Sequence, residues 1–401
     1  MIFSPLRGLT KLMITFLLFC SFLGLVSSTV FLVLVLEAAR RFHKEPRQAA
    51  NPPAWPFVTV LKPLHGMEPM LERNLESFFR LDYPQFEIIF GARHHDDPAL
   101  KIVNKLRSTY PNVKASIVLS GEPEYPNAKV FAMEKMVAAA EGSYFVITDS
   151  DVWVRPECVK EVIAPLIDPA VGVVTCLYRG MPAGGFWSTL EALGMSVEMT
   201  SGVLVANMLE GMRFALGPTM ATRKDILESI GGVASLGSYC ADDYILGNRA
   251  FHSGKTVVLS HHVIEHVAMN TSAASSLAHQ VRWMRSTRFS RHAGHLGTGL
   301  TYAMPFGLLG LFAGTAAYGL PLGIALFGWA FFNRIVQAIS IGWGVLDDRR
   351  SLWLSWLYPL RDLMGFLVWC ASFAGNEIIW RNERYRLVTD GKMVRKRAAR
   401  A

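Results

Sequence analysis

Short apolar runs alternate with amphipathic segments in the first half of the central region. Runs rich in β-branched and aromatic residues predict strands at 57–61, 87–91, 115–119 and 144–147. Helical spacing of apolar residues predicts helices between them, at 70–79, 98–110 and 128–140. Strands that alternate with helices are typical of an open, mostly parallel α/β sheet. Ligands of such sheets bind beyond the carboxyl ends of the strands, so polar residues that follow a strand are the first candidates for chemistry.

Longer apolar runs lie towards both ends of the chain. The uncharged run 13–36 is long enough to cross a bilayer as a helix, and we expect it to be an uncleaved anchor. The run 294–332 is long enough for two joined spans, with a turn near Tyr318-Gly319-Leu320-Pro321. Polar residues interrupt a further apolar segment, 352–374, which leaves a span, a re-entrant segment and an interfacial helix all open.

The composition fits a water-soluble domain flanked by membrane segments. Of the 401 residues, 51% are hydrophobic and 18% are charged, which is too apolar for an ordinary soluble enzyme and too polar for a pure transporter. We therefore expect a transmembrane anchor with a basic linker, a cytoplasmic catalytic domain, transmembrane or re-entrant segments, and a basic tail. Their expected bounds are 1–48, 49–293, 294–380 and 381–401.

Much of the formal net charge of +8 lies beside the apolar runs, as in Arg40-Arg41 and Lys396-Arg397. Basic residues next to a span favour the cytoplasmic side and contact anionic lipid headgroups. We therefore expect a multi-pass protein of the cell inner membrane, with its catalytic domain on the cytoplasmic face. Nucleic acid is not an expected partner, because no basic stripe interleaved with aromatic residues marks the central region. The five cysteines form no CxxC pair, which favours a reducing compartment.

Asp149-Ser150-Asp151 follows the apolar strand expected at 144–147. Two carboxylates one residue apart can reach one hard divalent cation, Mg²⁺ or Mn²⁺, which also binds diphosphate oxygens. Such a cation neutralises charge on a leaving nucleoside diphosphate. An ordinary polar turn is the alternative, but the position after a buried strand favours a metal site at Asp149 and Asp151.

Two further acidic pairs begin helical segments, and each also suits the capping of a helix. Asp97 follows the second expected strand, where it could accept hydrogen bonds from a base or ribose. Asp242 and Asp243 lie about ninety residues after the first acidic motif. Separate acidic groups suit sugar transfer with inversion, in which one set holds the cation and another carboxylate deprotonates the acceptor hydroxyl. We assign the role of base to Asp243.

The stretch His279-Gln280-Val281-Arg282-Trp283 precedes the C-terminal apolar run. Arg282 can pair with a diphosphate, and Trp283 can stack on a sugar or an acceptor. Arg285, Arg288 and Arg291 continue at a spacing of three residues, so a plain interfacial amphipathic helix is the other interpretation. The two interpretations are compatible.

In chain order, Asp97, Asp149, Asp243 and Arg282-Trp283 resemble the D, D, D, (Q/R)xxRW signature of inverting glycosyltransferases of the GT-A fold. The chain is most similar to the ceramide glucosyltransferase family, glycosyltransferase family 21, over roughly residues 10–390. The shared stretches are Leu61-Lys62-Pro63-Leu64-His65-Gly66, Leu81-Asp82-Tyr83-Pro84, Asp96-Asp97-Pro98-Ala99, Tyr110-Pro111-Asn112-Val113, Asn127-Ala128-Lys129 and Asp242-Asp243-Tyr244.

Within that family, 208–220 and 283–291 most resemble the bacterial hopanoid-biosynthesis glycosyltransferases. This resemblance implies transfer of N-acetylglucosamine from a UDP-sugar to a membrane lipid, a hopanoid polyol such as bacteriohopanetetrol. It also implies a GT-A domain with N- and C-terminal transmembrane helices. The chain departs from the family at His279, where the signature has Gln or Arg, and at Asp151, where the ceramide enzymes have Gly.

The resemblance also implies a role for individual residues. Asp97 would contact the uridine, and Lys129 would meet the nucleotide or its phosphates. The acidic motif described above would bind the cation, with Asp243, next to Asp242, as the base. Arg282 and Trp283 would close over the diphosphate and the acceptor.

Three other functions stay open. The first is a ceramide glucosyltransferase that makes glucosylceramide from UDP-glucose, and the second is a processive polysaccharide synthase, which needs more spans than this chain offers. The third is a zinc peptidase, because His262, Glu265 and His266 match the HxxEH pattern. That chemistry needs a helix, whereas the residues around 255–260 predict a strand.

Overall fold

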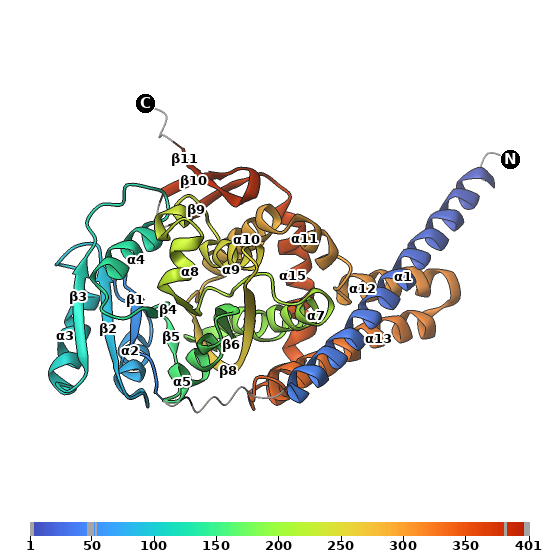
Figure 1. Ribbon diagram of the computed structural model, residues 1–401. Helices are drawn as coiled ribbons and strands as arrows, with labels where there is room; N and C mark the ends of the chain where they lie inside the picture. Colours follow the sequence, from blue (N-terminus) through green and yellow to red (C-terminus); the bar gives the residue numbers. More distant parts are fainter. Residues whose placement is uncertain (1–3, 46–51, 53, 381–382, 397–401) are drawn as a thin grey trace. The chain divides into compact units, whose positions relative to one another are not determined.

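The computed structural model describes residues 4–45, 52, 54–380 and 383–396, and side chains from residue 11 onward (Figure 1). The chain divides into two compact units. One, the sheet unit, comprises Pro46–Thr189, Leu209–Thr271 and Asn376–Ala401. The other, the apolar unit, comprises Met1–Glu45, Leu190–Met208 and Ser272–Gly375.

The sheet unit begins with the alternation that the sequence predicts. Its first strands are β1 (Val58–Pro63), β2 (Phe86–Ala92), β3 (Lys114–Leu119) and β4 (Tyr144–Thr148). The helices between them are α2 (Leu71–Phe79), α3 (Ala99–Thr109) and α4 (Ala128–Ala139). Every predicted strand and helix of this region is confirmed to within a few residues. β1 is buried along its whole length, including its two polar residues, Thr59 and Lys62.

The strand order explains where a ligand site forms. The eight-stranded sheet runs β3-β2-β1-β4-β7-β6-β8-β5, and β3, β2, β1 and β4 are parallel neighbours. The chain winds outward from β1 to β3 and then returns to place β4 on the other side of β1 (Figure 1). Right-handed crossovers therefore put α2 and α3 on one face and α4 on the opposite face. In sheets of this kind, a ligand site is expected at the carboxyl ends of β1 and β4, where the direction of winding reverses.

The second half of the sheet is mixed. β7 (Thr219–Arg223) runs antiparallel to both β4 and β6 (Val171–Pro182), while β8 (Thr256–Ala268) is parallel to β6. The two-residue strand β5 (Val152–Trp153) pairs antiparallel with β8. Short helical segments connect these strands: α5 (Cys158–Ile163), η1 (Ala164–Ile167), α8 (Lys224–Ser229), η3 (Val233–Leu236) and α9 (Asp242–His252).

The described part of the expected basic tail, together with residues 377–380 of the expected transmembrane or re-entrant segments, folds as part of the sheet unit. β9 (Glu377–Trp380), β10 (Glu383–Leu387) and β11 (Met393–Arg395) form a three-stranded antiparallel sheet, with the turn η6 (Thr389–Gly391) before β11. In β10, the buried side chains of Tyr385 and Leu387 alternate with exposed ones, which gives the sheet one inward face. This alternation is difficult to recognise in the sequence, because the strands are short and many of their residues are basic.

The apolar unit consists of helices. The long helix α1 (Ser4–Lys44) runs beside α12 (Met304–Tyr318) and α13 (Leu320–Ala338), as Figure 1 shows. Its other elements are η2 (Gly194–Met199), α7 (Thr200–Glu210), α10 (Ala273–Ser290), α11 (His292–Thr298), η4 (Ile339–Trp343), α14 (Ser351–Leu354), η5 (Ser355–Leu357) and α15 (Tyr358–Ser372). The helix α6 (Gly185–Leu193) leads from one unit into the other.

Three helical stretches of the described residues are long and apolar enough to cross a membrane: Lys11–Lys44, Gly185–Glu210 and Leu320–Trp343. The expected N-terminal run therefore forms a helix of sufficient length. The expected turn near Gly319 is present, since Gly319 has φ 92° and separates α12 from α13. The stretch Gly185–Glu210 was not expected from the sequence, because it is less apolar than the other two. In the structure, two thirds of its most apolar window is buried inside the protein.

The units differ from the expected domain bounds. Residues 190–208 and 272–293, expected in the catalytic domain of 49–293, cluster instead with the apolar helices, whereas 376–401 cluster with the sheet. Contacts between distant segments decide this division, and hydrophobic periodicity along one segment does not report them. The expected bounds remain predictions for the functional domains.

A buried ion pair explains one of the polar residues inside the apolar segment 352–374, Asp362. Arg334 Nη1 lies 3.1 Å from Asp362 Oδ1, and both side chains are 2% exposed. The other carboxylate oxygen, Oδ2, accepts hydrogen bonds from the backbone N–H groups of Ala303 (3.0 Å) and Met304 (2.8 Å), where α12 begins. Arg334 also donates to the carbonyl of Thr301 (3.1 Å). One carboxylate thus joins α13, α15 and the start of α12.

We expect Asp362→Ala to destabilise the protein by about 3–5 kcal/mol, because it leaves Arg334 buried without its counter-charge. Glu37→Ala is the matched control. It removes the ion pairs of Glu37 with Arg40 and Arg41, whose side chains are 53% and 59% exposed, and each such exposed pair contributes about 0–1 kcal/mol. Thermal or urea unfolding of the detergent-solubilised protein measures both. Equal shifts in the two variants would contradict a structural role for the buried pair.

Candidate active site

One lysine stands between acidic residues from distant parts of the chain. Lys129, on the first turn of α4, places its Nζ 2.6 Å from Asp149 Oδ1 and 3.9 Å from Asp242 Oδ2. The Lys129 side chain is only 12% exposed. Burial opposes its charge, but Asp149 and Asp242 outweigh that effect and raise the pKa of Lys129. Lys129 therefore stays cationic and holds these carboxylates together.

The start of α4 is fixed by its capping residue. Asn127 Oδ1 accepts a hydrogen bond from the N–H of Val130 (3.1 Å), as expected of an N-cap. Its Nδ2 donates to Asp242 Oδ1 (3.1 Å) and to the carbonyl of Tyr239 (3.0 Å). Asn127 thus aligns Lys129 with the loop that leads to Asp242. Asn127 belongs to the stretch Asn127-Ala128-Lys129, which the chain shares with the family. The sequence does not predict the contact of Asn127 with Asp242.

The C-terminal sheet holds the other side of the same loop. The N–H of Met393 donates to the carbonyl of Ser238 (2.7 Å), and the N–H of Cys240 donates to the carbonyl of Gly391 (3.2 Å). Between these bonds, Tyr239 forms an isolated antiparallel bridge with Lys392. The last described strand therefore supports the backbone immediately before Asp242.

Asp243 lies on the first turn of α9 beside Asp242. Burial raises its pKa to about 6, with a further rise from the charge of Asp242. A methyl group on Gly217 would lie 2.8 Å from Asp243 Oδ2, so the absence of a side chain at Gly217 leaves the space that this carboxylate occupies. A carboxyl group with a pKa near 6 suits a general base that works near neutral pH.

Each residue of Asp149-Ser150-Asp151 has a separate polar partner. Lys62 Nζ, at the end of β1, donates to the carbonyl of Asp149 (2.5 Å). Ser150 Oγ donates to Glu68 Oε2 (2.6 Å), and His266 Nε2 lies 3.1 Å from Asp151 Oδ2. This loop is therefore fixed at three points.

Burial perturbs two of these partners. It lowers the pKa of Lys62 to about 7 and raises the pKa of Glu68 to about 7. Neither residue was assigned a role from its sequence context. The detectable signal was a charged residue, Lys62, inside an apolar strand, where charge is rarely placed without a partner.

The acidic loop fits a divalent cation. Asp151 Oδ1 is buried and accepts no hydrogen bond from the described residues, although Asp151 Oδ2 meets His266. The Asp149 side chain is 30% exposed and can present its carboxylate to the crevice. The described residues contain no group of three or more His, Cys, Asp or Glu side chains able to hold a metal. Asp149 and Asp151 would therefore supply two ligands, and phosphate oxygens or water the others.

Asp97 has a structural role in this fold. Both of its carboxylate oxygens accept from the N–H of Gly66 (3.1 Å each), and Oδ1 also accepts from the N–H of Ala99 (2.9 Å). It thereby joins the loop after β1 to the first turn of α3, in agreement with the capping alternative. These bonds do not decide whether it also meets a nucleotide, so that role remains a prediction.

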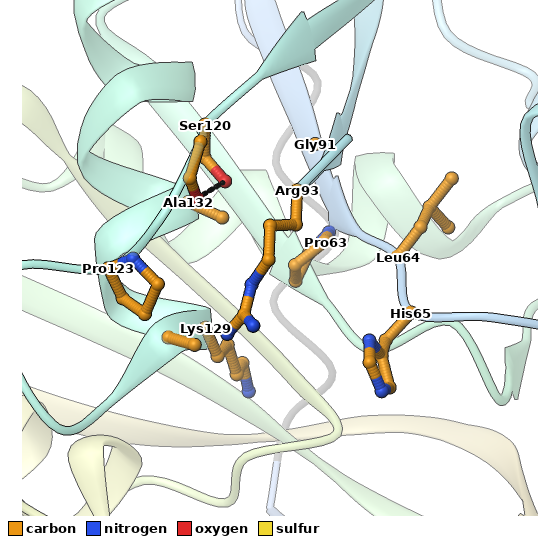
Figure 2. A pocket seen from close by; sticks show the side chains of 11 residues that line it. Pro63, Leu64, His65, Gly91, Arg93, Ser120, Pro123, Lys129 and Ala132 are labelled. Atoms are coloured by element: carbon orange, nitrogen blue, oxygen red, sulfur yellow. Dashed lines mark hydrogen bonds between the residues drawn. The ribbon is translucent and has the colours of Figure 1, made fainter. Parts of the chain in front are cut away.

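A cavity lies beside this loop at the ends of β1, β2 and β3. Figure 2 shows the side chains of His65 and Arg93 projecting into it, with Lys129 at its rim near α4. The other lining residues are Pro63, Leu64, Gly91, Ser120, Gly121, Pro123, Ala128 and Ala132. Asp97 is not among them. Arg93 was not singled out in the sequence, because a single arginine after a strand carries no specific signal.

Arg282 and Trp283 lie on α10 in the apolar unit, whereas the other candidate residues lie in the sheet unit. Within the apolar unit, the ring of Trp283 lies 4.2 Å from that of His279. His279 Nδ1 in turn lies 2.8 Å from Glu191 Oε1. The roles of Arg282 and Trp283 towards a ligand stay predictions.

The zinc-peptidase alternative is wrong on geometry. His262, Glu265 and His266 lie on β8 rather than on a helix, as the surrounding sequence predicted. Glu265 pairs with Arg73 and Arg179, each at 2.6 Å, whereas His266 meets Asp151. His262 lies 3.3 Å from Glu161 on α5. The three side chains therefore have separate partners and do not form one zinc site.

The model of the family described as Glycosyl transferase family 21 matches residues 20–393. Ceramide glucosyltransferase 1 of Caenorhabditis elegans is 26% identical over 378 residues, covering 91% of this chain and 79% of the relative. Ceramide glucosyltransferase of Komagataella phaffii is 34% identical over 156 residues, covering 38% of this chain and 30% of the relative.

Among solved structures, the chain resembles mannosyltransferase PcManGT from Pyrobaculum calidifontis, in complex with GDP-Man and Mn²⁺. The TM-score is 0.55 at 19% identity, and the match covers 88% of this chain and 99% of PcManGT. This likeness confirms the expected GT-A fold. The apolar helices and the ceramide glucosyltransferase relatives together indicate a membrane-associated protein.

The family model spans nearly the whole chain, from the first apolar helix to the C-terminal sheet. The resemblance to the ceramide glucosyltransferase family is confirmed, and a particular affinity with the hopanoid enzymes stays a prediction. This protein is a glycosyltransferase and belongs to glycosyl transferase family 21.

Proposed function

We propose that the protein transfers N-acetylglucosamine from a UDP-sugar to a hydroxyl of a membrane lipid, with inversion at the anomeric carbon. The acceptor we favour is a hopanoid polyol such as bacteriohopanetetrol. One observation carries the proposed chemistry: Asp243, whose pKa is raised to about 6, adjoins the cluster of Asp149, Lys129 and Asp242 at the carboxyl ends of the strands. A candidate base and a candidate site for a divalent cation with its diphosphate therefore occur together.

In the proposed reaction, Asp243 accepts the proton of the acceptor hydroxyl. The acceptor oxygen attacks the anomeric carbon, and the bond from that carbon to the diphosphate breaks, which releases UDP. Asp149 and Asp151 would hold a divalent cation, Mg²⁺ or Mn²⁺, which would neutralise charge on the departing diphosphate. PcManGT was solved with Mn²⁺, which supports a cation in this role.

The remaining candidate residues are proposed to orient the donor. When the cation and diphosphate bind, Lys129 is placed to exchange its ion pair with Asp149 for one with a phosphate oxygen. The base and ribose would occupy the cavity of Figure 2, near Asp97. We propose that Arg282 pairs with the diphosphate and that Trp283 stacks on the sugar or acceptor.

A lipid acceptor is supported by the apolar unit, which supplies helices long enough to cross a membrane. We propose a multi-pass protein of the inner membrane whose sheet unit faces the cytoplasm. The second candidate reaction makes glucosylceramide from UDP-glucose, and the ceramide glucosyltransferase relatives favour it. Asp151 favours the first candidate, because the ceramide enzymes have Gly at this position.

The donor and the acceptor are tested directly in membranes that contain the protein. We expect labelled UDP-N-acetylglucosamine to give a labelled polyol lipid and UDP-glucose to give little, with the product identified by mass spectrometry. Membranes that carry Asp243→Asn provide the blank. Labelled glucosylceramide formed from UDP-glucose would replace our proposal with the second candidate.

Asp243→Asn should lower kcat about 10²- to 10⁴-fold, the usual contribution of a general base. It should not lower the unfolding midpoint at pH 7. A raised carboxyl pKa means that the ionised form is disfavoured by folding, and this penalty is present above about pH 6 and absent below the ordinary value of 3.8. Asp225→Asn, an exposed carboxyl paired with Arg223, is the control and should keep its activity. Full activity in Asp243→Asn would remove this residue as the base.

The pH profile tests the same assignment independently. Because a base must be ionised, kcat/KM should fall tenfold per pH unit below about pH 6 and level off above it. The profile is measured at saturating cation with the wild-type protein in detergent. A flat profile through this range would show that the titration of Asp243 does not control the reaction.

Asp149→Asn tests the proposed cation site. We expect loss of activity and at least a tenfold weaker affinity for Mn²⁺ in the presence of UDP, because a carboxylate ligand is lost. Chelation should abolish the wild-type activity, and added Mn²⁺ or Mg²⁺ should restore it. Unchanged Mn²⁺ affinity in Asp149→Asn would be incompatible with this site.

A further inference from the structure

His266 is buried against the acidic loop, and the proposed reaction gives it no task. Its side chain is 9% exposed, and its Nε2 lies 3.1 Å from Asp151 Oδ2. The ring of Tyr178 packs edge-on against it, with ring centres 5.3 Å apart and an interplanar angle of 83°. Tyr178 is itself 4% exposed. The imidazole is thus enclosed between a fixed aromatic ring and a carboxylate.

The backbone around this contact is equally constrained. β5 and β8 pair with Val152 opposite His266, and the N–H of Val267 donates to the carbonyl of Asp151 (3.0 Å). Backbone hydrogen bonds therefore fix the position of Asp151 relative to β8. What remains free is the rotation of its carboxylate about χ1 and χ2, and the contact with His266 restricts that rotation.

The contact leaves one particular oxygen available. Oδ2 of Asp151 is occupied by His266, whereas Oδ1 is buried and has no hydrogen-bond partner among the described residues. A buried carboxylate oxygen without a partner is costly unless a ligand completes it. The arrangement therefore presents Oδ1, rather than Oδ2, as the atom that can bind a cation.

We propose that His266 is a positioning residue, which orients Asp151 so that its Oδ1 faces the divalent cation of the acidic loop. The inference rests on the proposed metal role of Asp151 and adds to it a residue of the HxxEH stretch. Histidine here acts through the carboxylate and does not touch the substrate. Partners of this kind fix the orientation of a ligand, and their loss typically weakens metal affinity about 10- to 100-fold.

A second buried histidine on β8 provides a matched control. His262 lies four residues earlier on β8 and is fully buried, but it meets Glu161 on α5 instead of the acidic loop. The variants His266→Phe and His262→Phe both replace a buried imidazole by a ring of similar shape. Their effects on packing are therefore comparable, and only the first removes the partner of Asp151.

The experiment measures Mn²⁺ binding to the full-length, detergent-solubilised protein in the presence of UDP, by electron paramagnetic resonance of free Mn²⁺. We expect His266→Phe to raise the apparent Kd about 10- to 100-fold, and His262→Phe to change it less than about 2-fold. His266→Gln keeps a side-chain N–H donor and should stay within about 3-fold of wild type. If His266 had only a structural role, Phe would fit this buried position better than Gln, and His266→Phe would bind Mn²⁺ more tightly than His266→Gln.

A double-mutant cycle with Asp151→Asn identifies the route of the effect. If His266 acts through Asp151, His266→Phe should add less than about 2-fold to the Kd of Asp151→Asn. Additive losses, or equal Kd values for the two phenylalanine variants, would overturn the inference. Those results would leave the proposed function intact, because its own tests use the labelled donors, Asp243→Asn and Asp149→Asn, and none of these tests depends on His266.

Discussion

The candidate site depends on one buried ammonium group that offsets several carboxylates. Lys129 contacts Asp149 directly and lies near Asp242, and without it the charges of these acids would repel one another uncompensated. Burial, together with the charge of Asp242, raises the pKa of Asp243, which lacks so close a cation. Lys129 thus holds Asp149 near Asp242, while the neighbouring Asp243 is a weaker acid.

The crevice is a product of chain topology. β1 and β4 are neighbours in space because the chain reverses its direction of winding after β3, so Lys62 and Asp149 meet although 87 positions separate them. β8 and the C-terminal sheet then fix the loops on either side, through His266 and through the bonds to Ser238 and Cys240. The family match, which extends to residue 393, includes β9 and β10 of this last sheet and the first residue of β11.

The apolar unit uses charge in a comparable way. Arg334 and Asp362 are buried among apolar helices, and Asp362 also receives the first N–H groups of α12. A buried pair of this kind contributes little net energy compared with apolar side chains, but it specifies which helices pack together. In both units, polar groups placed in apolar surroundings define position, and the apolar contacts supply most of the driving force.

The sequence by itself determined the local elements of the first half of the sheet unit, the apolar helices with their turn at Gly319, and the acidic motifs at the ends of strands. Each of these follows from patterns within about ten neighbouring residues, such as a buried β-rich run before Asp149 or a helical period after Asn127. The family resemblance then assigned them a chemistry. It could not assign partners, because the sequence of one segment carries no record of which distant segment packs on it.

Only the tertiary structure decided those partners. It placed His266 of the HxxEH stretch against Asp151, folded the basic tail into a sheet beside Tyr239, and joined Asn127 to Asp242. It also assigned the carboxylate of Asp97 to backbone N–H groups. The physical reason is common to all four: burial makes each polar group find a partner, and that partner is whichever group the fold brings within about 3 Å.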